Sequence, residues 1–148
     1  MRFVLVATLA MLVVAPTASA ATEKILDVQQ MAALEAKALQ ATPKEQCFLY
    51  AELAHSMAEL ASQQLNAGDS EHASASLKAV QQYAAKIHMG MADDARKLKN
   101  AEILMRHTAF RLKEVMLAAS LDDRPTLEST LKQLDQVEAE MMVQVFKH

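Results

Sequence analysis

Apolar residues recur three and four positions apart over most of the chain, and this spacing predicts amphipathic helices rather than strands. Helix start and stop signals divide the pattern into five segments, at about 22–40, 42–66, 69 or 70 to 89, 93–119, and 122 to the C-terminus. The fold class that follows is all-α: a five-helix antiparallel (up-down) bundle. Helices of similar length that are joined by short loops pack against their neighbours in opposite directions.

Individual residues mark the ends of these helices. Thr42, Pro43 and Glu45 have the order of a capping box with proline at the first helical position. Gly68 follows the second helix, where a residue of left-handed conformation commonly ends a helix. The acidic and proline-containing stretch 122–125 begins the last helix.

Gly90 leaves two alternatives for the connection between the third and fourth helices. It either ends the third helix, with Asp93 capping the fourth, or lies inside one long helix at a cost of about 1 kcal/mol relative to alanine. The neighbouring acids Asp93 and Asp94 favour the break, because a helix N-terminus attracts negative charge.

One face of each of the four longer helices is apolar, and together these faces predict one continuous core. The expected core residues are, in chain order, Leu49, Tyr50, Leu53, Met57, Leu60, Ala61, Ala73, Leu77, Val80, Tyr83, Ala84, Ile87, Leu98, Ala101, Leu104, Met105, Leu112, Val115, Met116, Leu127, Leu131, Leu134, Val137, Met141 and Val145.

The fourth predicted helix carries a second apolar line. Ile103, Phe110 and Leu117 are seven residues apart and lie nearly opposite its core face. Apolar side chains gathered in one place are seldom left in water, so either the first helix covers this line or another molecule does. In the second case the line is a partner surface, for another protein or for a homodimer.

The beginning of the chain has a different pattern. Arg2 precedes an apolar run over 4–14, and Ala18-Ser19-Ala20 offers a small-x-small cleavage site. The run is about half the ~20 residues that a membrane-spanning helix needs. We therefore expect 1–20 to be a cleaved signal peptide and 21–148 to be one helical bundle domain. The mature protein is expected to be exported, periplasmic or secreted from a bacterium, soluble, and without a membrane span.

Composition and charge agree with a helical protein and narrow its partners. The chain has two glycines and three prolines, and straight-chain helix formers dominate it. Net charge is −5 over 21–77, +5 over 78–113 and −4 over 114–148. A basic middle between acidic ends indicates charge complementarity between neighbouring helices of the same chain. Nucleic acid is excluded as a partner, since there is neither a basic domain nor a set of stacking aromatic residues.

Catalytic motifs are absent from the sequence. It contains no nucleophile elbow, phosphate-binding loop or HExxH motif, and its two glycines leave little material for tight catalytic loops. We therefore expect a protein that is not an enzyme, with a structural, protein-interaction or holdase-like role in the cell envelope.

A metal or haem carrier is the alternative function. His88, Met89 and Met91 place one imidazole and two thioethers close together, and Cu(I) accepts such soft ligands. Haem is a related possibility, because an exported four-helix bundle can hold it between a methionine and a histidine. Met31 and His148 are such a pair here, although the covalent Cys-x-x-Cys-His attachment motif is absent.

Glu52-x-x-His55, followed by Glu59, resembles the Glu-x-x-His element of ferritin-like di-iron bundles. That chemistry needs two such elements and two further carboxylates pointing into the bundle, and the sequence has no second Glu-x-x-His. Helical phase places all three side chains away from the core stripe of their helix. We therefore interpret Glu52, His55 and Glu59 as part of a polar face in contact with solvent.

The stretch 57–80 resembles a tetratricopeptide hairpin, through Leu60-Ala61, Gly68-Asp69, Ala73 and Leu77. The resemblance implies a peptide-binding protein. It covers about a sixth of the chain, and no second copy follows at the repeat length of about thirty-four residues.

Cys47 is the only cysteine of the chain, so it cannot form an internal disulfide. It lies in the second turn of a predicted helix, where the helix dipole slightly favours the thiolate. We expect a small, partly covered helical residue. A reactive thiol or an intermolecular disulfide is the alternative.

Overall fold

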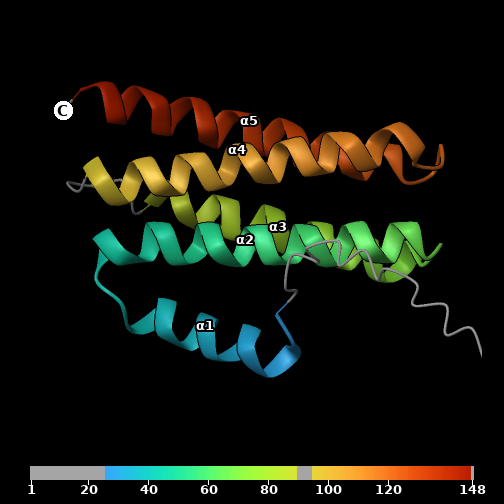
Figure 1. Cartoon of the computed structure of the whole chain (residues 1–148), viewed down its shortest axis with the longest axis horizontal. Coiled ribbons are helices and arrows are strands. Elements are labelled where there is room, and N and C mark those ends of the chain that lie inside the picture. Colours follow the sequence, from blue (N-terminus) through green and yellow to red (C-terminus); the bar gives the residue numbers. More distant parts are fainter. Residues whose placement is uncertain (1–25, 90–94, 148) are drawn as a thin grey trace, which may run out of the picture.

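The computed structural model describes residues 26–89 and 95–147, and within those ranges every regular element is an α-helix (Figure 1). The helices are α1 (Val28–Gln40), α2 (Pro43–Asn66), α3 (Ser70–Met89), α4 (Ala95–Ala118) and α5 (Arg124–Phe146). The predicted all-α class is confirmed, and the bounds of α2 to α5 lie within two residues of those expected. None of the described helices combines the length and the apolar character needed to cross a membrane.

The first helix starts later than the sequence pattern predicted. Asp27 is its N-cap: the carboxylate accepts the N–H of Gln30 at 2.8 Å, and the Gln30 side chain accepts the N–H of Asp27 at 3.1 Å. This reciprocal capping box satisfies two backbone donors and fixes the start of α1 at Val28. The part of the prediction that covers 22–25 lies outside the described residues.

The turn between α2 and α3 is a Schellman motif, as Gly68 indicated. Gly68 has a φ of +76°, which a residue without a Cβ adopts at no steric cost. Its N–H donates to the carbonyl of Leu65 at 3.0 Å, and the N–H of Asp69 donates to the carbonyl of Gln64 at 2.8 Å. The Asp69 carboxylate then accepts the N–H of His72 at 3.3 Å and so caps α3.

The predicted capping box at the start of α2 is incomplete. Thr42 is the N-cap and Pro43 follows it, but the Thr42 side chain makes no hydrogen bond to the helix backbone. Its hydroxyl donates to the carboxylate of Glu45 at 3.2 Å. Lys97 of α4 lies 3.5 Å from the same carboxylate, so Glu45 also links α2 to α4.

Four helices form the bundle, and α1 lies outside it against α2 (Figure 1). Both α2 and α5 contact α3 and α4, so the order around the bundle is α3, α2, α4, α5. Although α3 and α4 follow each other in the sequence, their described residues make no backbone contact. Helices α3 and α4 therefore lie diagonally across the bundle. Loop lengths alone would have made them direct neighbours.

Ion pairs give the relative direction of α2 and α4. Glu45 pairs with Lys97, and Glu59 pairs with Arg111, so residue numbers rise together along the two helices. These two neighbours are therefore parallel. They are adjacent in space without being adjacent in sequence, so the rule of short loops and antiparallel neighbours does not apply to them.

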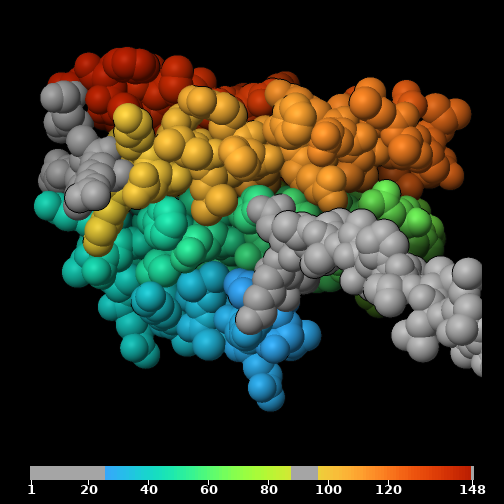
Figure 2. All heavy atoms as spheres, viewed as in Figure 1, coloured from blue at the N-terminus to red at the C-terminus, as the bar shows by residue number. Residues whose placement is uncertain are grey.

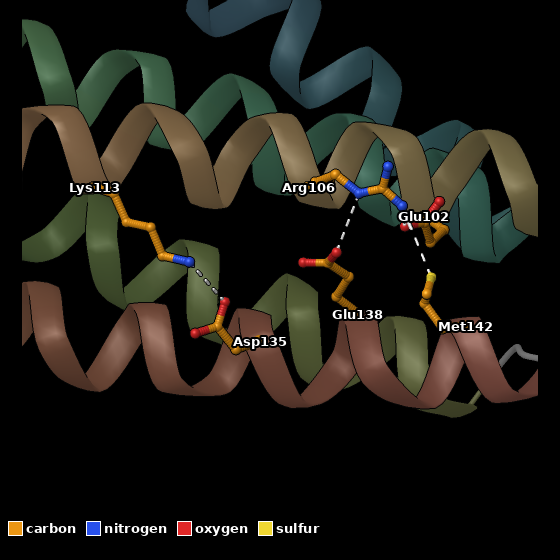
Figure 3. Close-up of polar contacts among 6 residues, drawn as sticks. All are labelled: Glu102, Arg106, Lys113, Asp135, Glu138 and Met142. Carbon is orange, nitrogen blue, oxygen red and sulfur yellow. Dashed lines mark hydrogen bonds and ion pairs between the residues drawn. The ribbon is translucent and has the colours of Figure 1, made fainter.

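Ion pairs also join α4 to α5 (Figure 3). Arg106 lies 3.3 Å from Glu138, and Lys113 lies 3.3 Å from Asp135, so residue numbers fall on α5 as they rise on α4. Arg106 also pairs with Glu102, one turn earlier on its own helix. The predicted complementarity between a basic middle and acidic ends is confirmed for α4, whose bases meet acids of α2 and α5.

The predicted core is confirmed, with a few of its members only partly buried. Those at its edge are Met57, Leu60, Tyr83, Leu104, Met116 and Val145. The core also takes in small residues of α2 that the apolar stripe did not include, namely Ala51, Ala54 and Ala58. Because α2 packs against α1, α3 and α4, more than one of its sides is buried.

Candidate functional site

An open groove of about 760 Å³ lies between α1 and α4, and α2 forms its floor. It exists because α1 packs on α2, while the described residues of α1 and α4 make no backbone contact. In Figure 2, α1 (blue) and α4 (yellow to orange) lie on opposite sides of α2. The apolar walls come from Leu26, Ala33, Leu34, Phe48, Ile103 and Leu104.

The C-terminal half of α1 contains its most deeply buried residue, while Met31 and Leu34 pack partly against the core along the rest of the helix. Ala38 is fully buried, and the side-chain amide of Gln46 donates to its carbonyl oxygen at 3.0 Å. A smaller cavity of about 460 Å³ continues the groove here and shares Lys37, Phe48 and Asn100 with it. The two cavities are therefore adjacent to each other along α2.

Polar side chains interrupt the apolar walls along the length of the groove. Gln30 and Lys37 come from α1, and Asn100 and His107 come from α4. Each pair is seven residues apart, which is about two helical turns or ~10 Å. Glu52, His55 and Ser56 add polar atoms on the floor. The groove thus offers hydrogen-bonding groups at both ends and apolar contact between them.

A hydrogen bond fixes His55 on the floor. Its Nδ1 lies 3.0 Å from the hydroxyl of Thr108 on α4. The Thr108 hydroxyl also donates to the carbonyl of Leu104 at 2.8 Å. The contact between His55 and Thr108 links α2 to α4 beneath the groove.

Glu52 is half-buried on the floor of the groove. Burial raises its pKa above the usual value, because the charged form loses hydration there, and the positive charge of Lys37 across the groove offsets part of this effect. Glu52 therefore gives up its proton less readily than an exposed glutamate.

Glu59 lies one turn beyond His55 and is buried, with 6% of its surface exposed. Its Oε2 lies 3.3 Å from Nε of Arg111, while Oε1 has no hydrogen-bond partner among the described residues. Arg111 also reaches Glu114 at 3.4 Å. The neighbouring Glu59 charge is the main reason that the pKa of Arg111 is raised.

The prediction that Glu52, His55 and Glu59 form a solvent-exposed face is therefore wrong. Glu59 is buried, and Glu52 and His55 are half-buried, because α4 packs against this side of α2. Within the described residues, no group of three or more histidine, cysteine or acidic side chains is placed to hold a metal ion. The likeness to the di-iron element is thus confined to the sequence.

Most of the predicted metal and haem ligands lie outside the described part of the chain. This holds for Met91 and His148, and for the side chains of His88 and Met89 at the end of α3. The question of whether Gly90 breaks a helix falls in the same gap, between α3 and α4. Met31 is described, and it is half-buried against the core.

The second apolar line of α4 is exposed. Ile103, Phe110 and Leu117 keep 43%, 64% and 85% of their surface in contact with solvent. Of the two alternatives, cover by the first helix is wrong for Phe110 and Leu117, because α1 packs on α2, and of these three residues Ile103 alone lines the groove beside it.

Cys47 lies in the second turn of α2 and is buried, with 3% of its surface exposed. Burial raises its pKa to about 11, which outweighs the effect of the helix dipole. At pH 8 the thiolate fraction is then roughly a hundred times smaller than for an ordinary thiol. We expect a thiol reagent such as dithionitrobenzoate to label Cys47 rapidly in urea and very slowly in the native protein. Rapid labelling of the folded protein would show that this thiol is accessible.

Several residues of the groove had no signal in the sequence. Ala33, Phe48 and Asn100 follow no motif, and their role depends on where α1 docks. The nearest clue was the pair Glu52 and His55. The sequence singled it out for its likeness to a di-iron element, and in the structure it lies on the floor of the groove.

In comparisons with protein-family models, with curated proteins and with solved structures, nothing matches this chain. Its function has to be inferred from the groove and the exposed surfaces themselves.

Proposed function

We propose that this chain is an exported, non-catalytic protein of the bacterial cell envelope that binds apolar polypeptide segments in the groove between α1 and α4. Its role is then protein interaction of a structural or holdase-like kind. Residues 1–20 act as the cleaved signal peptide in this proposal, and the mature part is an up-down helical bundle with α1 on its outside. The leader pattern of the sequence supports export.

The groove carries the proposal, because it combines apolar walls with polar groups at its two ends and on its floor. Leu34 and Ile103 offer apolar contact, while the amides of Gln30 and Asn100 both donate and accept hydrogen bonds. A polypeptide brings apolar side chains together with backbone N–H and C=O groups that need partners. An acyl chain has no groups that would pair with amides spread along the groove.

The size of the groove suits a short extended segment. The floor from Glu45 to Ser56 on α2 is about 16 Å long, at 1.5 Å per helical residue. An extended chain covers that length with about five residues. Leu, Ile or Val at alternate positions would face the apolar walls.

The exposed line of Ile103, Phe110 and Leu117 belongs to the same interaction role. Three large apolar side chains in line on one helix form a surface that another protein chain can cover. The line begins at the rim of the groove, since Ile103 contributes to both.

The test is binding of a fluorescein-labelled peptide of about eight residues with leucine at alternate positions, followed by fluorescence anisotropy. Ala33→Trp places an indole in the groove, and Ala32→Trp is the matched control on an exposed, neighbouring position of α1. The wild-type chain has no tryptophan, so each variant also reports the environment of its indole.

We expect saturable binding by the wild-type protein, at least tenfold weaker binding by Ala33→Trp, and an unchanged affinity for Ala32→Trp. A peptide with serine in place of leucine should not bind. Equal affinities for the two tryptophan variants, or no saturable binding by the wild type, would refute the proposal.

A further inference from the structure

Met142 has surroundings that no other methionine shares among the side chains that the structure describes. Its side chain lies on α5 and keeps 37% of its surface exposed, whereas Met105 and Met141 are fully buried. The other described methionine side chains are only partly exposed and pack against the core: Met31, Met57 and Met116. A dissolved oxidant therefore reaches the thioether of Met142 more easily than the other thioethers in these ranges.

A guanidinium lies beside this thioether (Figure 3). Nη2 of Arg106, on α4, donates a hydrogen bond to Sδ of Met142 over 3.8 Å. Nη2 also donates to the carboxylate of Glu102, and Nε donates to Glu138 at 3.3 Å. A thioether sulfur is a weak acceptor, so one N–H group of Arg106 is poorly satisfied while Met142 is reduced.

We propose that Met142 is a site of oxidative modification, at which a peroxide converts the thioether into a sulfoxide that Arg106 then binds. A lone pair of Sδ attacks one oxygen of hydrogen peroxide, the O–O bond breaks and the sulfur–oxygen bond forms. The departing hydroxide takes the proton of the transferred oxygen and leaves as water. The sulfur is thus oxidised by two electrons, and a methionine sulfoxide reductase that draws electrons from thiols reverses the change.

The sulfoxide oxygen suits the N–H group of Arg106 better than the sulfur does. It is a polar acceptor, and a hydrogen bond from a charged donor is about twice as strong as one between neutral groups. The methionine side chain has three rotatable bonds, so the new oxygen can turn toward Nη2 from either lone-pair position on the sulfur. Because Arg106 already reaches Glu138 on α5, the sulfoxide adds a second bond between the same two helices. Oxidation at Met142 therefore strengthens the link between α4 and α5.

Met141, the preceding residue, shows how position decides the effect of oxidation. A sulfoxide there would place a polar oxygen inside the core, and burial shields its thioether from the oxidant. The two adjacent methionines therefore offer the same chemistry with opposite expectations. This inference goes beyond the proposed function and does not depend on it, since the described residues of α5 make no backbone contact with α1.

Mild treatment of the mature protein with hydrogen peroxide tests the site, and tandem mass spectrometry assigns the oxidised residue. We expect Met142 to be oxidised at least about tenfold faster than Met141 in the folded protein, and the two rates to be equal in urea. Equal rates for the two methionines in the folded protein would overturn the proposal.

Melting temperatures before and after oxidation test the bond from Arg106. The double variant Glu102→Gln with Arg106→Leu removes the guanidinium without leaving the Glu102 carboxylate unpaired. In both the wild-type and the double-variant background, Met142→Leu under the same treatment gives the contribution of the other methionines, which is subtracted.

We expect the remaining change in melting temperature, which belongs to Met142, to be more favourable in the wild-type background by at least about 2 °C. That result would show that Arg106 holds the sulfoxide. Equal changes in the two backgrounds, or a less favourable change in the wild type, would overturn the proposal.

Discussion

Replacing Leu112 with alanine is expected to lower the free energy of unfolding by about 2–5 kcal/mol. Leu112 is fully buried on α4, in the core cluster that it shares with residues of α2 and α5. The substitution removes three carbon atoms and leaves a cavity that long, packed helices close only in part.

The matched control is Leu117→Ala, which makes the same chemical change on the same helix. Leu117 is 85% exposed, so its loss should change the free energy of unfolding by less than about 0.5 kcal/mol. Urea denaturation of dilute protein, followed by circular dichroism, measures both values. Similar losses for the two variants would mean that α4 does not present these faces to core and solvent.

Removing Arg111 has the second large expected effect. Arg111→Met removes the ion-pair partner of the buried Glu59 carboxylate, whose Oε1 already lacks a hydrogen bond within the described part of the chain. A buried charge without compensation costs several kcal/mol, but Arg111 is itself 41% exposed, so water screens part of the effect. We expect a loss of about 1–3 kcal/mol in the free energy of unfolding.

The double variant Glu59→Met with Arg111→Met distinguishes a lost pair from lost packing. Removing both charges should recover most of the stability, because apolar residues of similar volume often replace a buried ion pair without cost. The same urea titrations of both variants give the comparison. A double variant that is less stable than Arg111→Met alone would show that the side chains matter for their shape and not for their charge.

The helices and the core follow from local signals in the sequence. Gly68 ends α2 in a left-handed conformation that glycine adopts without steric cost, and Pro43 begins α2. Apolar residues recur at helical spacing on each helix. Members of these patterns, such as Leu77 on α3 and Leu134 on α5, are buried in the structure. Such features depend on neighbours within a few turns, so a single sequence reveals them.

The arrangement of the helices depends on contacts that no local pattern encodes. Ala54 and Ala58 of α2 are fully buried, yet alanine is also common on exposed helix faces, so its presence did not reveal a second packed side. Phase analysis consequently placed Glu59 in solvent, whereas it lies under α4. A polar residue opposite the main stripe is exposed only if no further helix docks there.

The groove was not predictable for the same reason. It is a consequence of how α1 docks, which Ala38 and Gln46 decide at one end of the helix. Sequence analysis did identify Ile103, Phe110 and Leu117 as an apolar line, and the structure leaves that line exposed.

The central claim is that an apolar polypeptide segment binds between α1 and α4. Titration of the leucine-containing peptide into isotope-labelled mature protein, followed by amide chemical shifts, tests it most directly. We predict that the largest shifts occur at Ala33, Leu34, His55, Asn100 and Ile103, which line both sides and the floor of the groove. Shifts confined to α3 and α5, or no shift at a saturating peptide concentration, would contradict it.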